Sequence, residues 1–175
     1  PIVESLNAVL WTLSAYFIGL NANAFIYDAL FSALIVMTFI DIDTKEIPNG
    51  IVVFIIILSI PLFFTAKDVV WWHRLVGAVV ISVPLYVIAL VTGGIGGGDI
   101  KLYFALGLVL GLYPTLVSAF IAIVSAGLIG GALLLTKKVR KGYELPLGPF
   151  IALGAVVTVF AGTPIIDGIK NIFGI

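Results

Sequence analysis

Long apolar runs separated by short polar segments restrict this chain to a bundle of membrane-crossing helices. A helix needs about 20 mostly apolar residues, with a range of roughly 17 to 25, to cross the hydrocarbon core of a bilayer. The candidate segments are residues 2–20, 23–40, 50–65, 74–92, 100–112, 115–136 and 148–165. We therefore predict an all-α polytopic transmembrane bundle of about seven segments, folded as a single domain over residues 1–175.

The composition excludes a soluble domain and several kinds of site. Hydrophobic residues make up 62% of the chain and charged residues 10%, whereas about 25% of an ordinary soluble domain is charged. Nine Lys and Arg balance nine Asp and Glu, so net charge gives no reason to expect a nucleic-acid partner. The chain contains no cysteine, which excludes disulfides, a thiolate nucleophile and a cysteine-type zinc site.

One apolar run must fold back on itself. Residues 100–136 carry a single charge, Lys101, over 37 residues. As one helix this run would be about 55 Å long, against a hydrocarbon core of about 30 Å. Pro114 lacks an amide hydrogen and disfavours helix in the residue before it. We therefore predict a turn at Gly111–Pro114.

Counting membrane crossings places two acidic loops on the same face as a basic run. These loops hold Asp41 and Asp99, and the run comprises Lys137, Lys138, Arg140 and Lys141. Lys45 and Lys101 add to this face, whereas the other face has Lys67, Arg74 and Lys170. Because cytoplasmic loops are enriched in Lys and Arg, we predict that both aspartates lie at the cytoplasmic face.

Asp41 and Asp99 are the strongest candidates for chemistry. Asp41 directly follows the apolar run ALIVMTFI, and Asp99 follows the glycine-rich run GGIGGG. Carboxylates at membrane depth are costly and are functional candidates by default. Glycines allow positive φ and close approach of another chain, although a hinge or close helix packing would also use them. Two neighbouring carboxylates can share a proton and act as base and acid on water.

Two motifs resemble those of the type IV prepilin peptidase family, whose members are intramembrane aspartic proteases of the GxGD type. The first is D-x-D-x-x-x-I-P-N, from Asp41 to Asn49, and the second is G-x-G-D-x-K, from Gly96 to Lys101. The resemblance implies that Asp41 and Asp99 are the catalytic pair, without metal or cofactor. The residues expected to support the site are Gly96, Gly98, Lys101, Pro48 and Asn49.

The resemblance also implies a substrate and a location. The substrate would be a prepilin or pseudopilin, cut after its leader at the cytoplasmic side of the plasma or inner membrane by a multi-pass enzyme. Many bacterial members begin with a further helix and a four-cysteine segment, which we expect to be absent here. The N-methyltransferase activity that often accompanies cleavage in the family is therefore left open.

Two rival functions use the same acids. A metal-dependent lipid phosphotransferase would hold a divalent cation with Asp41, Asp43 and Asp99, although Asp43 and Glu46 are expected to be solvated loop charges. A transporter would move protons or cations past the acids, but both acids are expected at one end.

Lys101 would either orient Asp99 or anchor its helix at the interface. We expect His73 in an aromatic belt at the opposite face.

Overall fold

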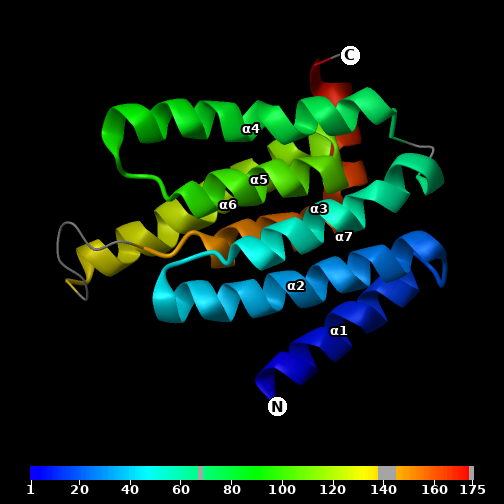
Figure 1. Cartoon of the computed structure of the whole chain (residues 1–175), viewed down its shortest axis with the longest axis horizontal. Helices are drawn as coiled ribbons and strands as arrows, with labels where there is room; N and C mark the ends of the chain where they lie inside the picture. Colours follow the sequence, from blue (N-terminus) through cyan, green and yellow to red (C-terminus); the bar gives the residue numbers. More distant parts are fainter. Residues whose placement is uncertain (67–68, 138–144, 174–175) are drawn as a thin grey trace.

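The chain folds into seven helices in a computed structural model that describes residues 1–66, 69–137 and 145–173, and no strand occurs among them. The helices are α1 (Ile2–Phe17), α2 (Ala22–Thr44), α3 (Asn49–Thr65), α4 (Trp71–Thr92), α5 (Gly97–Leu110), α6 (Leu112–Leu135) and α7 (Gly148–Phe173). Successive helices run back and forth, so the ends of α2, α4 and α6 lie at the same end of the bundle (Figure 1). The predicted all-α bundle is confirmed.

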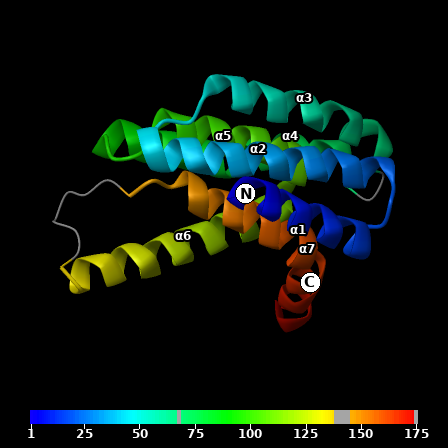
Figure 2. The same cartoon turned by 90° about the horizontal axis from the view of Figure 1, so that it is seen from below.

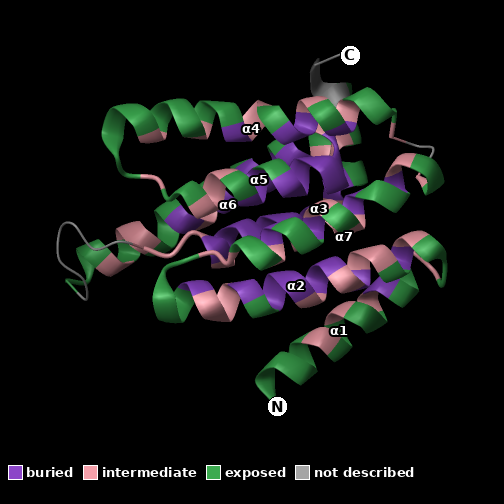
Figure 3. Ribbon diagram, viewed as in Figure 1, coloured by how far each residue is buried: buried purple, intermediate pink, exposed green. Residues whose placement is uncertain are grey.

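The core forms around α5, which packs against α3 and α4, and around the first part of α7, which packs against α2 and α6. Figure 3 shows α5 largely buried, whereas α4 is exposed along much of its length. The exposed side chains of α4 include Val83, Tyr86 and Leu90. Such an apolar outer surface suits lipid rather than water. Among the described residues, α2, α4, α6 and the Gly148–Gly168 part of α7 are long and apolar enough to cross a membrane.

The turn predicted at Gly111–Pro114 is present, and the break between the two helices lies at its first residue, Gly111. Gly111 has φ 83° and separates α5 from α6. This positive φ costs glycine little because it has no Cβ. Pro114 lies in the first turn of α6, where a missing amide hydrogen breaks no intrahelical hydrogen bond.

Close packing of α4 on α5 determines the position of α5. A Cβ added to Gly77 would lie 2.7 Å from the carbonyl carbon of Gly111 and 2.8 Å from the carbonyl oxygen of Gly107. The two helices therefore approach backbone to backbone, which only small residues permit.

Arg74, which was counted among the charges of the other face, lies inside the bundle. The helix α4 begins at Trp71, and the Arg74 side chain is fully buried. Its Nη1 donates hydrogen bonds to the carbonyl oxygens of Leu108 and Val109. The last carbonyls of a helix lack intrahelical partners and carry partial negative charge. Arg74 therefore stabilises the C-terminal end of α5.

The helices α2 and α7 extend beyond their predicted C-terminal ends. The helix α2 continues to Thr44 and ends where Lys45 adopts φ 56°, so Asp41 lies in its last turn instead of the following loop. The helix α7 extends beyond the predicted residue 165 to Phe173 and contains Pro164; its last turns run in a different direction from its first part (Figure 2). Lys67 and Lys138–Lys141 lie outside the described residues.

Candidate active site

Asp41 and Asp99 come together at one end of the bundle. Asp41 is in the last turn of α2, and Asp99 is in the first turn of α5. Both side chains line the same two pockets, and the Asp41 carboxylate acts electrostatically on Asp99. The predicted convergence of these two residues, which are far apart in sequence, is therefore present in the fold.

The Asp41 carboxylate is held by the start of α7. Only 4% of the Asp41 surface is exposed, and the backbone N–H of Gly148 donates to its Oδ2 at 2.8 Å. Gly148 is the first residue of α7. The first N–H groups of a helix have no intrahelical acceptor and carry partial positive charge, which favours a carboxylate beside them.

A side chain at position 148 would displace Asp41 and Met37. A Cβ would lie 2.7 Å from Asp41 Oδ2 and 2.8 Å from Met37 Sδ. Gly148 was not among the predicted site residues. The pair Gly148-Pro149 before an apolar run was a signal that a helix begins there, because proline is favoured in the first turn of a helix.

The glycine run before Asp99 makes room for the neighbouring loop. A Cβ on Gly98 would lie 2.9 Å from Cβ of Ile47, in the loop between α2 and α3. The close approach predicted for the run is therefore present at Gly98. Gly96 is the N-cap of α5 with φ −66°, and its carbonyl accepts the Asp99 N–H at 3.1 Å. Within the run, positive φ occurs at Gly93, which ends α4.

Asn49 and Lys101 connect α3 to α5. Pro48 is the N-cap of α3, and Asn49 is its first residue. The Nζ of Lys101 donates a hydrogen bond to Oδ1 of Asn49 at 3.1 Å. Lys101 and Asn49 line one of the two pockets with both aspartates. Lys101 thus joins the two helices at the wall of this pocket.

Other acidic and basic residues lie away from the pair or remain solvated. Asp43 and Glu46 are exposed, as expected for loop charges. Within the described ranges, no group of three Asp, Glu, His or Cys side chains is placed to hold a metal ion. His73 packs against Trp72 and Tyr113 in the first turn of α4. The helix α4 begins at the end of the bundle opposite the C-terminal end of α2 (Figure 1).

Two pockets give water access to the acid pair from different sides. The first, here called the loop pocket, lies between the α2–α3 loop and the glycine run, and it includes Glu46 and Gly97. The second, here called the entry pocket, lies between the α4–α5 loop and Leu145–Leu147, the segment that leads into α7. An extended peptide that occupied both pockets would pass across both carboxylates.

By its fold and its acid pair, this protein falls in the class of polytopic helical membrane proteins that hold two carboxylates in one cleft. Comparison with known families is more specific, because the type IV leader peptidase family matches residues 29–131, more than half of the chain. The chain belongs to the type IV leader peptidase family. The predicted family and enzyme class are therefore confirmed.

Similar curated proteins share the same name, prepilin leader peptidase/N-methyltransferase. The Bacillus subtilis (strain 168) protein is 33% identical over 95% of this chain and 68% of its own length. The Burkholderia pseudomallei (strain 1026b) protein is 31% identical over 94% of this chain and 55% of its own length. The Neisseria gonorrhoeae protein is 31% identical over 87% of this chain and 54% of its own length. The chain thus spans between about half and two thirds of these relatives. No solved structure matches.

Proposed function

We propose that this chain is an aspartic endopeptidase that removes the leader peptide of prepilin-like proteins with Asp41 and Asp99. The observation that carries the proposal is the presence of both carboxylates in the same two pockets. Membership in the leader peptidase family supports the reaction, and the names of the relatives support the substrate class. The methyl transfer in those names is not part of the proposal.

The chemistry requires only the acid pair and a water molecule. Two nearby carboxylates share one proton, because both do not ionise easily together. The ionised member takes a proton from water, whose oxygen attacks the scissile carbonyl carbon, while the protonated member donates its proton to the carbonyl oxygen. Breakdown of the tetrahedral intermediate cleaves the C–N bond. The carboxyl group that took the water proton gives it to the leaving nitrogen. The other carboxylate takes a proton back from a hydroxyl group of the tetrahedral intermediate.

Cleavage of a synthetic peptide tests this function. The peptide carries a basic leader followed by an apolar helix and is incubated with the purified protein in detergent. We expect one cut near the leader–helix junction, detected by mass spectrometry, at a rate unchanged by EDTA. A rate that EDTA abolishes and magnesium restores would instead support the cation-dependent rival, and an intact peptide would count against the peptidase itself.

We further propose that the acid pair faces the cytoplasm, since Lys45 and Lys101 lie beside it and basic residues favour that side. Single cysteines at Asp43 and Leu20 test this in a chain that has no other cysteine. Asp43 lies at the aspartate end of α2, and Leu20, which is 83% exposed, precedes its opposite end.

In intact cells, a membrane-impermeant thiol reagent is expected to label Leu20→Cys and to leave Asp43→Cys unlabelled. Permeabilised cells provide the control, because both positions should then react. Labelling of Asp43→Cys alone in intact cells would place the acid pair outside the cell and contradict cleavage of a cytoplasmic leader.

A further inference from the structure

A groove lies over α5, between α3 and α4. In Figure 1, α5 lies between these two helices, and it packs against both of them, so it forms the floor of the groove. The groove holds about 460 Å³, which is within the range of roughly 300 to 1,000 Å³ for ligand pockets. The residues that line it include Asn49, Val53 and Ile56 of α3, Ser82 of α4, and Lys101 and Phe104 of α5. We call it the α5 groove.

The helix α5 is exposed in this groove and buried elsewhere along most of its length. From Leu102 to Leu110 every residue is buried except Phe104, of which 39% is exposed. Lys101 lies one helical turn before Phe104, so both residues share a face of α5, and both line the groove. Beyond Lys101, the surface of α5 is therefore open only in the α5 groove.

The α5 groove is continuous with the loop pocket that holds both aspartates. Asn49 and Lys101, which are joined by a hydrogen bond, line the groove and the loop pocket alike. From this junction the groove follows α3 as far as Ile56, which is about 10 Å along the helix axis at 1.5 Å per residue. Its walls become apolar in that direction, at Val53, Ile56 and Phe104. A chain that passes the acid pair can therefore continue into an apolar channel without crossing a helix.

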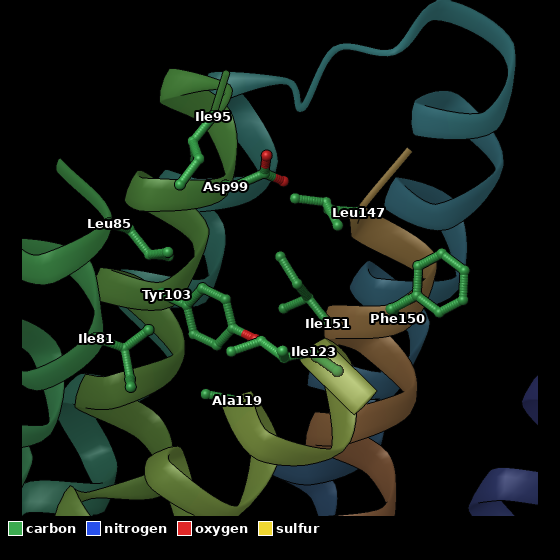
Figure 4. A pocket seen from close by; sticks show the side chains of 11 residues that line it. Ile81, Leu85, Ile95, Asp99, Tyr103, Ala119, Ile123, Leu147, Phe150 and Ile151 are labelled. Atoms are coloured by element: carbon green, nitrogen blue, oxygen red, sulfur yellow. The ribbon is translucent and has the colours of Figure 1, made fainter. Parts of the chain in front are cut away.

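A second apolar space beside Asp99 is too small to receive a helix. It lies between α4, α5, α6 and α7, and Figure 4 shows Asp99 and Leu147 at one end of it and Ala119 at the other. This space holds about 60 Å³, whereas a helix with its side chains is about 10 to 12 Å wide. The α5 groove is larger and is open at its side, where Val53 is 53% exposed.

We propose that the α5 groove binds the first turns of the apolar helix that follows the leader in the substrate. This inference rests on the proposed peptidase function. It also gives the bound substrate a direction, with the helix side of the scissile bond in the loop pocket and the leader in the entry pocket. A substrate helix suits the groove better than a lipid tail, because the groove begins at the acid pair, where the substrate must lie to be cleaved.

Narrowing the groove at Val53 tests this proposal. Val53 lines the α5 groove but not the loop pocket, so Val53→Trp changes no group beside the acids. Val87→Trp is the matched control, because Val87 of α4 is also 53% exposed but does not line the groove. The two probes are a leader–helix peptide and a short peptide that has the same leader and cut site but lacks the helix, both measured at one detergent concentration.

Val53→Trp is expected to raise KM for the leader–helix peptide about tenfold and to change kcat less than about twofold, because the lost contact is made equally in the bound substrate and in the transition state. KM for the short peptide should not change, since this peptide has no helix to displace. Val87→Trp should match wild type for both peptides. An equal effect of Val53→Trp on both peptides, as expected if a lipid tail fills the groove, overturns the proposal, and so does a wild-type KM for the leader–helix peptide.

Crosslinking locates the substrate helix without relying on catalysis or on tolerance of a larger side chain. Because the chain has no cysteine, Val53→Cys and Val87→Cys each introduce a single thiol. Both are made in the Asp41→Asn variant, which is expected to keep the peptide intact. The leader–helix peptides carry one cysteine at successive positions of the first helical turns.

On oxidation, Val53→Cys is expected to form a disulfide with peptide cysteines that recur about every 3.6 residues, and Val87→Cys is expected to form none. Non-reducing gel electrophoresis detects the product. Absence of the Val53→Cys product, or equal products at both positions, contradicts binding in the α5 groove.

The two proposals fail in different ways. If wild type cleaves neither peptide, the peptidase function fails. If wild type cleaves the peptides but Val53→Trp has wild-type kinetics and Val53→Cys forms no crosslink, only the helix-binding role of the groove fails. If Val53→Trp does not fold, the crosslinking result decides the proposal.

Discussion

Asp41→Asn and Asp99→Asn are each expected to lower kcat/KM for leader cleavage by at least about 10³-fold, because an amide cannot exchange a proton with water in the required way. Both side chains line the same two pockets, so they are expected to act as one unit. The double variant should therefore be no slower than either single variant. Mass-spectrometric or fluorogenic measurement of peptide cleavage in detergent provides the comparison.

Asp43→Asn is the matched control for this prediction. Asp43 lies two residues from Asp41, but its side chain is exposed, so the variant should retain substantial cleavage. Equal inactivity of all three variants, together with a rate that depends on added magnesium, would favour the lipid phosphotransferase arrangement of Asp41, Asp43 and Asp99.

The second large effect is expected from Gly148→Ala, which changes no ionisable group. The added Cβ would lie 2.7 Å from Asp41 Oδ2, so either the carboxylate or the start of α7 must move. A displacement of about 1 Å in a reacting group can cost about 10²-fold in rate. We therefore expect kcat/KM to fall about 10²-fold or more, whereas the amount of folded protein in the membrane falls much less.

Gly50→Ala is the control for Gly148→Ala. Gly50 also lies in the first turn of a helix, α3, but a Cβ added there meets nothing within 4 Å. This variant should cleave like wild type. Wild-type activity in Gly148→Ala would show that Asp41 does not depend on its contact with the start of α7.

The fold class and the family were predictable because their signals are local in the sequence. Apolar runs indicated the helices, and the motifs around Asp41 and Asp99 gave the acid pair and the family. The exact helix ends were less predictable. Asp41 proved to lie inside α2 and Asp99 inside α5, because the ends of a helix also depend on what packs against it.

The sequence by itself determined the membrane-embedded helical class, the fold-back within residues 100–136, and the two acids at one end. These features follow from segment length, hydropathy and the alternation of crossings, all of which can be counted along the chain. Only the tertiary structure showed that Gly148 holds Asp41, across 107 positions of sequence, that Arg74 stabilises the end of α5, and that an apolar pocket opens beside Asp99. Each of these features depends on which helices face each other and at what distance. Backbone contact at residues such as Gly77 and Gly107 and close packing of the whole core decide that arrangement.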